Sequence, residues 1–111
     1  MEIRDNNSVY ILAPLSPVLD KNEAKRVFFN LEQETRRIAL DLSYVVDCTA
    51  DFFEALNEFS KKKEVSLFNI TSDIFVLLNS LGLDRCIKLF VSELDFEENS
   101  REIVNRRFSL V

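Results

Sequence analysis

The apolar residues of this chain recur with two different spacings, which separate predicted helices from predicted strands. In three segments they fall at positions i, i+3, i+4 and i+7, the spacing of an amphipathic helix. These segments run from about Lys21 to Thr35, from Thr49 to Lys62 and from Ser72 to Leu81. The stripes expected to face the core are Ala24, Val27, Phe28 and Leu31; Phe52, Ala55, Leu56 and Phe59; and Ile74, Leu77, Leu78 and Leu81.

Short apolar runs between these segments predict strands. In the run 36–46, the residues Ile38, Leu40 and Leu42 alternate over a length typical of a central strand. The polar stretch 4–8 favours a turn, so the apolar residues on either side of it predict an N-terminal hairpin. The expected strands are residues 1–3, 9–15, 36–46, 64–70 and 87–92.

Residues that stop strands or start helices mark the boundaries of these elements. Pro14 and Pro17 end the second strand, because proline cannot donate a hydrogen bond to a neighbouring strand. Asp20 is expected to cap the first helix, and Thr71 or Ser72 to cap the third, through side-chain oxygens that accept from free backbone N–H groups.

The element order predicts an α/β protein with a mixed sheet. Gly82 and Leu83 are typical of the end of a helix, and residues 97–111 predict a C-terminal helix with a weaker stripe of Ile103, Val104 and Phe108. The order is then β-β-α-β-α-β-α-β-α. It implies an N-terminal hairpin followed by parallel strands, covered on at least one face by about four helices. No linker is visible, so we expect a single domain over residues 1–111.

Composition and charge exclude several classes of function. The chain of 111 residues has a net charge of −5, which argues against nucleic-acid binding. No apolar run is long enough to insert into a membrane, and the polar N-terminus resembles no signal peptide, so we expect a cytoplasmic protein. There is no His and there are only two Cys. A zinc site, a cofactor and enzymatic activity are therefore not expected, and a Mg²⁺ site formed by Asp20 and Asp47 has little support.

The stretch 36–90 resembles the STAS domain of the anti-sigma factor antagonist type. It reads "RRIALDLSYVVDCTADFFEALNEFSKKKEVSLFNITSDIFVLLNSLGLDRCIKLF", with "LDLS" at 40–43 and "LGLD" at 81–84. The family places an Asp-Ser-Ser-Gly turn after its "LDLS" strand. "SPVLD" at 16–20 occupies the place of an earlier "GELD" turn. With the N-terminal hairpin, the resemblance extends over nearly the whole chain and implies a STAS-like fold.

The resemblance implies a regulatory switch at the turn after residue 46. In such antagonists the first Ser of the turn is phosphorylated by a kinase that is also the anti-sigma factor, and the unphosphorylated form binds that kinase. Here Asp47 matches the Asp, Cys48 takes the phosphoserine position, Thr49 matches the second Ser and Ala50 the Gly. Asp20 matches the Asp of the earlier turn. Cys48 cannot be phosphorylated as a Ser is, whereas Thr49 could be.

The same residues have other interpretations. Cys48 is either a small apolar residue at a strand–helix junction or a thiol made reactive by the helix N-terminus. A disulfide with Cys86 is not expected, because the two residues fall at opposite edges of a parallel sheet. Thr49 is either an N-cap or a phosphoacceptor. Phe53 lies outside the second stripe and is expected on the helix surface beside the switch, unless it belongs to the edge of the core. Phe29 and Phe75 share that interpretation.

The sequence therefore predicts a non-enzymatic protein-binding module. The leading hypothesis is an antagonist that binds an anti-sigma factor or kinase through Asp20, Asp47, Cys48, Thr49, Ala50 and Phe53. The alternative is an accessory subunit of a transporter, for example one for lipids, or of a larger signalling complex. The oligomeric state stays open.

Overall fold

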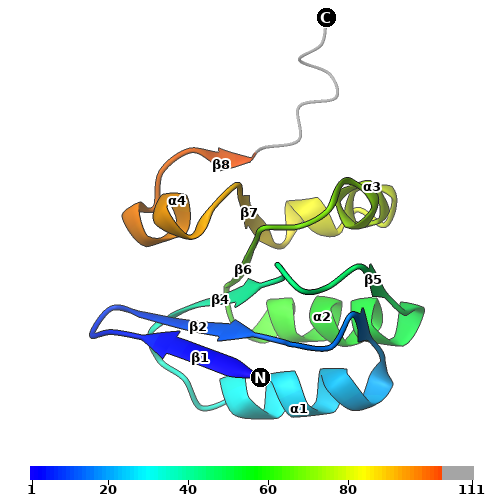
Figure 1. Ribbon diagram of the computed structural model, residues 1–111, viewed down its shortest axis with the longest axis horizontal. Helices are drawn as coiled ribbons and strands as arrows, with labels where there is room; N and C mark the ends of the chain where they lie inside the picture. The colour runs from blue at the N-terminus through cyan, green and yellow to red at the C-terminus, as the bar shows by residue number, and fades with distance from the viewer. Residues whose placement is uncertain (104–111) are drawn as a thin grey trace, which may run out of the picture.

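The computed structural model describes residues 1–103, which form one six-stranded sheet, a small two-stranded sheet and four α-helices (Figure 1). The large sheet contains β1 (Glu2–Asp5), β2 (Val9–Ala13), β4 (Arg37–Asp41), β6 (Val65–Phe68), β7 (Lys88–Phe90) and β8 (Glu102–Ile103), in the order β1-β2-β4-β6-β7-β8. The small sheet pairs β3 (Val18–Leu19) with β5 (Asp47–Cys48). The helices are α1 (Lys21–Leu31), α2 (Ala50–Lys62), α3 (Ser72–Ser80) and α4 (Glu93–Glu98), with one 3-10 turn, η1 (Leu83–Arg85).

The pairing of the large sheet confirms the predicted mixed topology. β1 runs antiparallel to β2, whereas β2, β4, β6 and β7 are parallel neighbours. Each parallel connection contains one helix, and right-handed crossovers place successive helices on the same face of the sheet. The sheet extends by one further antiparallel strand, β8, which the sequence pattern did not predict.

The two faces of the sheet are covered unequally. One face packs against the buried stripes of α1, α2 and α3, which form the main core cluster with sheet residues such as Leu40 and Leu67. The opposite face has a smaller cluster around Phe96 of α4. Phe96 contacts Phe68 and Phe90, with ring centroids 5.9 and 5.8 Å away. Phe96 is thus the apolar side chain by which the short helix α4 packs on the sheet.

The expected helix boundaries are confirmed at their N-termini. The Asp20 carboxylate accepts from the Glu23 N–H at 2.9 Å, and the Thr71 hydroxyl accepts from the Ile74 N–H at 3.2 Å. Gly82 adopts φ 74° directly after α3, a left-handed conformation that suits glycine at the end of a helix.

Two predictions about the second half of the chain are wrong. Leu77 and Leu81 are exposed, because only Ile74 and Leu78 of α3 face the core. Leu81 is the C-cap residue beyond the last turn of α3, and Leu77 lies at the margin of the stripe, so neither side chain is buried.

The predicted C-terminal helix over residues 97–111 is also wrong, because residues 99–103 are not helical. Within the described residues the last helix, α4, ends at Glu98, and Asn99 takes a left-handed conformation with φ 53°. The chain then returns as β8, with Ile103 paired opposite Leu89. Val104 and Phe108 lie outside the described residues.

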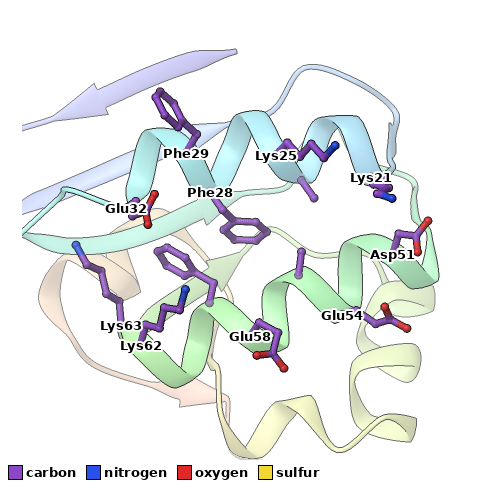
Figure 2. Close-up of a pocket in the computed structure, with 13 residues that line it drawn as sticks. Lys21, Lys25, Phe28, Phe29, Glu32, Asp51, Glu54, Glu58, Lys62 and Lys63 are labelled. Atoms are coloured by element: carbon purple, nitrogen blue, oxygen red, sulfur yellow. The ribbon is translucent and has the colours of Figure 1, made fainter.

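Helices α1 and α2 lie side by side and run in the same direction, which leaves a groove between them (Figure 2). Phe28 of α1 stacks on Phe59 of α2 with ring centroids 4.9 Å apart. The groove encloses about 820 Å³. None of the helices within residues 1–103 combines the length and the hydrophobicity that a bilayer crossing demands.

Candidate functional site

The two turns that the sequence singles out, at Asp20 and at residues 46–51, lie side by side. The link between them is the small parallel sheet, in which Val18 pairs with Asp47 and Leu19 with Cys48. The Val46 N–H donates to the Pro17 carbonyl at 2.8 Å, and the Thr49 N–H donates to the Leu19 carbonyl at 2.9 Å. Because α1 and α2 begin directly after these strands, the N-termini of both helices lie next to the small sheet (Figure 1).

Thr49 is the N-cap of α2. Its hydroxyl accepts from the Phe52 N–H at 3.3 Å, and its carbonyl accepts from the Phe53 N–H at 3.1 Å. The side chain is half-buried. Asp51 adds a negative charge in the first turn, where the helix dipole favours it. The capping interpretation of Thr49 is therefore confirmed, and a phosphoacceptor role stays a prediction.

The cap predicts a measurable effect on stability. Replacing Thr49 with alanine is expected to lower the free energy of unfolding by about 1 kcal/mol, because one N–H at the start of α2 loses its acceptor. Serine at this position keeps the hydroxyl and should retain most of the stability. Urea denaturation followed by circular dichroism measures both variants, and equal losses in the two would contradict the capping role.

Cys48 is an inert thiol in the core. Its side chain is only 7% exposed and belongs to the main hydrophobic cluster. Burial, together with a smaller effect of the adjacent Asp47 carboxylate, raises the pKa of the Cys48 thiol to about 12. The hypothesis of a thiol activated by the helix N-terminus is therefore wrong, because desolvation disfavours the thiolate more than the helix favours it. Cys86 is a second free thiol.

Asp47 and Ala50 occupy the positions that the resemblance assigns to Asp and Gly. Asp47 is exposed, and its carboxylate accepts from the Cys48 N–H at 2.8 Å. Ala50 is the first residue of α2 and is also exposed. It is not among the described residues with positive φ, so this turn forms without the freedom of a glycine.

The expectation of an exposed aromatic beside Thr49 is wrong for Phe53. The Phe53 side chain is only 6% exposed and packs edge-on against Phe52, with ring centroids 6.5 Å apart. At its N-terminal end α2 buries two adjacent aromatic residues, Phe52 and Phe53, so the buried stripe of the helix is wider there. Phe75 is half-buried against the main core, whereas Phe29 on α1 is 78% exposed.

Exposed aliphatic residues surround the two turns instead. Val18 is 42% exposed and lies in β3, and Val46 is 60% exposed and directly precedes β5. Leu15 and Tyr44, on the loops that lead into these strands, are exposed as well. These residues could not be predicted from the sequence, because a two-residue strand is too short for a period-2 pattern to appear.

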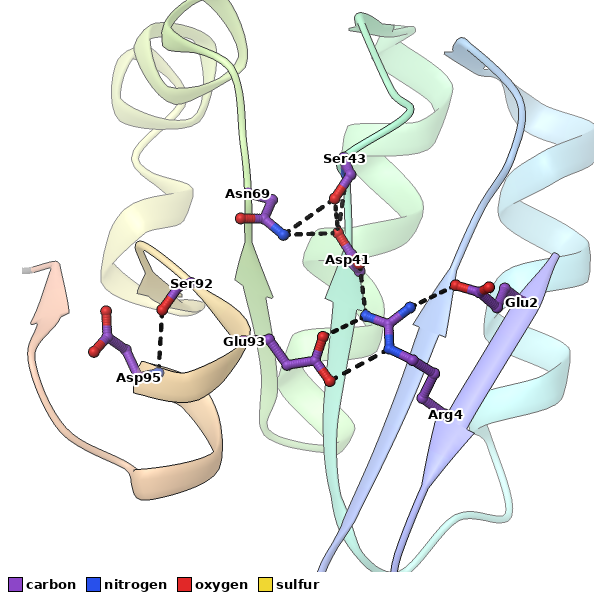
Figure 3. A network of polar contacts seen from close by, with 8 residues as sticks. All are labelled: Glu2, Arg4, Asp41, Ser43, Asn69, Ser92, Glu93 and Asp95. Atoms are coloured by element: carbon purple, nitrogen blue, oxygen red, sulfur yellow. Dashed lines mark hydrogen bonds and ion pairs between the residues drawn. The ribbon is translucent and has the colours of Figure 1, made fainter.

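A polar network at the ends of β4 and β6 was also missed (Figure 3). Arg4 of β1 donates from Nη2 to Asp41 Oδ2 and to Glu93 Oε1, each at 2.7 Å. Asp41 is 5% exposed and also accepts from the Ser43 hydroxyl and, at 3.2 Å, from the Asn69 amide. Burial opposes ionisation of Asp41, but these hydrogen bonds outweigh it and hold its pKa below the usual value.

The network joins the N-terminal strand, the sheet and α4. Asp41 and Ser43 belong to the "LDLS" motif, and Glu93 is the first residue of α4. Arg4 and Glu93 are 89 positions apart in the chain. No local pattern in the sequence indicates such a contact, so only the fold reveals it.

Comparison with known proteins tests the fold. No family model matches the chain, and no curated protein sequence matches it. Among solved structures, the fold is similar to that of a Thermotoga maritima protein described as a candidate anti-sigma factor antagonist. The TM-score is 0.75 with 21% sequence identity, over 90% of this chain and 93% of the other. The mixed sheet, its N-terminal hairpin and this likeness together show that the chain has a STAS-like α/β fold.

Proposed function

We propose that this protein is a non-enzymatic regulatory module that binds an anti-sigma factor of the kinase type in the cytoplasm. The observation that carries the proposal is the juxtaposition of the Asp20 and Thr49 turns, with exposed Val18 and Val46 between them. The similarity to a structure described as an anti-sigma factor antagonist supports the same class of partner. We define the binding surface as Leu15, Val18, Asp20, Tyr44, Val46, Asp47, Thr49, Ala50 and Asp51.

The chemistry of this surface indicates what the partner offers. Three exposed carboxylates, those of Asp20, Asp47 and Asp51, surround the aliphatic centre formed by Val18 and Val46. An apolar centre with a charged rim is typical of protein interfaces, where the centre supplies affinity and the rim supplies specificity. The matching partner surface carries an apolar contact flanked by Lys or Arg.

We propose that phosphorylation at residue 48 does not regulate this protein. A thiol cannot accept the phosphate as the family's serine does, and Cys48 is buried behind the turn. Thr49 is the remaining hydroxyl at the turn, and its oxygen already receives the Phe52 N–H. We therefore propose that the module stays competent to bind unless Thr49 is modified.

The test is binding to the anti-sigma kinase encoded nearest to the gene, measured by isothermal titration calorimetry. Val46→Asp is expected to weaken binding at least about tenfold, because it places a charge in the apolar centre of the interface. Leu94→Asp introduces the same change at an equally exposed residue of α4, on the other face of the sheet, and should leave binding unchanged. Absence of binding by the unaltered protein would remove the proposal.

Incubation with the same kinase and ATP tests control by phosphate. Intact-mass measurement followed by peptide mapping is expected to find no phosphate on residue 48. A phosphate mapped to Thr49 would show that the switch has moved by one position.

A permanent accessory subunit of a transporter or signalling complex is the second candidate. The observation in its favour is Cys48 itself, because loss of the acceptor removes the step that releases the partner. Co-purification of the tagged protein with a membrane ATPase would favour this candidate, and reversible binding to a kinase would count against it.

A further inference from the structure

The groove between α1 and α2 has an apolar floor that no part of residues 1–103 covers. Phe28 and Phe59 stack in its centre, and Ala24 and Ala55 leave room between the helices (Figure 2). Phe29 stands at its margin, 78% exposed. An exposed apolar surface with charged margins is typical of an interaction site.

The two margins of the groove carry opposite charges. The α1 margin is basic at its N-terminal half, with Lys21 and Lys25, whereas the α2 margin is acidic there, with Asp51, Glu54 and Glu58. At the C-terminal end the signs are reversed. Glu32 lies on the α1 side there, and Lys62 and Lys63 lie on the α2 side (Figure 2).

Most of these charges have no ion partner of their own. Within the described part of the chain, salt bridges at the groove include only Glu58, which pairs with Lys61 at 3.2 Å. Lys63 donates to the Glu34 carbonyl. Lys21, Lys25, Glu32, Asp51, Glu54 and Lys62 form no ion pair within residues 1–103, so they are available to a second molecule.

We propose that the groove is the interface of a homodimer whose two-fold axis runs along the helices. Because α1 and α2 point in the same direction, this axis lays α1 of one copy on α2 of the other with their N-termini aligned. Lys21 and Lys25 then face Asp51, Glu54 and Glu58 of the second copy, and Glu32 faces Lys62. A two-fold interface uses the same surface twice and requires this kind of self-complementarity.

The charges favour this axis over the other two-fold arrangement. An axis across the helices would lay α2 antiparallel on α2 of the second copy, which brings Glu54 opposite Glu58. Like charges placed opposite each other disfavour an interface. An axis across the helices also pairs unlike charges at its ends, Lys21 with Glu32 and Asp51 with Lys62. Only the axis along the helices avoids the like pair of Glu54 and Glu58, so it is the arrangement that we propose.

The test is a charge-swap experiment read by sedimentation velocity. Lys21→Glu with Lys25→Glu makes both margins acidic, and Glu54→Lys with Glu58→Lys makes both margins largely basic. Each double variant alone is expected to raise the dimer dissociation constant at least about tenfold, because its self-contacts become repulsive. An equimolar mixture should restore the dimer, since each acidic margin then meets a basic one.

Matched controls separate the groove from general charge effects. Glu97→Lys with Glu98→Lys makes the same change in net charge as the Glu54 and Glu58 variant, but on exposed residues of α4, and should leave self-association unchanged. Phe29→Ser should weaken the dimer without changing the circular dichroism spectrum, because the ring is mostly exposed in the monomer. A wild-type protein that stays monomeric at high micromolar concentration would overturn the proposal, as would a mixture that stays monomeric.

This proposal goes beyond the binding of an anti-sigma factor and can fail separately from it. The groove variants leave Asp20, Val46 and Thr49 unchanged. Loss of self-association in a variant that still binds the kinase would therefore separate the two surfaces.

Discussion

Replacement of Phe96 with alanine is expected to lower the free energy of unfolding by about 3–5 kcal/mol. The Phe96 side chain is fully buried, contacts the rings of Phe68 and Phe90, and lies under the guanidinium of Arg37, 4.3 Å from the ring centroid. A helix of six residues has little stability of its own. Loss of this ring would both leave a cavity and release α4, which would expose Phe68 and Phe90 to water.

Equilibrium unfolding in guanidinium chloride measures this effect. Leu94→Ala is the matched control, because Leu94 lies on the same helix and is 57% exposed. We expect the control to change the free energy of unfolding by less than about 0.5 kcal/mol. Similar losses in the two variants would mean that α4 does not depend on Phe96 for its position.

Replacement of Arg4 with methionine is expected to cost about 1–3 kcal/mol at neutral pH. The change keeps an apolar stem of similar length but removes the cation that contacts both Asp41 and Glu93. Asp41 would then be a buried carboxylate supported only by Ser43 and Asn69. Removing one partner of a buried ion pair is costly because the other charge stays desolvated.

This loss should depend on pH in a defined direction. The pKa of Asp41 is lower in the folded protein than in the unfolded chain, so its ionisation stabilises the fold above about pH 4. That contribution falls as the pH drops below about 4 and through the folded-state pKa. Because a protonated Asp41 needs no cation, the difference between Arg4→Met and the wild type should shrink over the same interval.

Thermal unfolding between pH 3 and pH 7 tests this dependence. Arg26→Met is the control, since Arg26 is exposed and approaches Glu23 only at 3.8 Å. Exposed pairs of this kind contribute little, so the control should match the wild type at every pH. A loss in Arg4→Met that stays constant down to pH 3 would contradict the role of Asp41.

The two proposed surfaces lie on the same two helices and share Asp51. The N-termini of α1 and α2 belong to the proposed partner site, because the Asp20 and Thr49 turns open there. The groove along the same two helices would join two copies. A homodimer with this geometry would present two partner sites at the same end of the four helices, so one dimer could engage two partner molecules.

Features that depend on neighbouring residues in the chain were predictable from the sequence. The caps at Asp20, Thr49 and Thr71 were correctly placed, because an N-cap side chain bonds a backbone group only three residues away. The parallel order of the central strands followed from helices of crossover length between them.

Features that depend on distant segments were decided by the tertiary structure alone. The sequence left Phe53 either on the helix surface or at the edge of the core. The packing of α2 buries it, since the width of a buried stripe is set by what lies opposite. The strand β8, the small sheet of β3 and β5 and the bond from Arg4 to Glu93 each join residues far apart in the chain. Local periodicity therefore determined the first three helices, the strands of the large sheet between them and the caps at the helix N-termini. The packing of those elements against one another decided which side chains are in contact and which surfaces stay exposed.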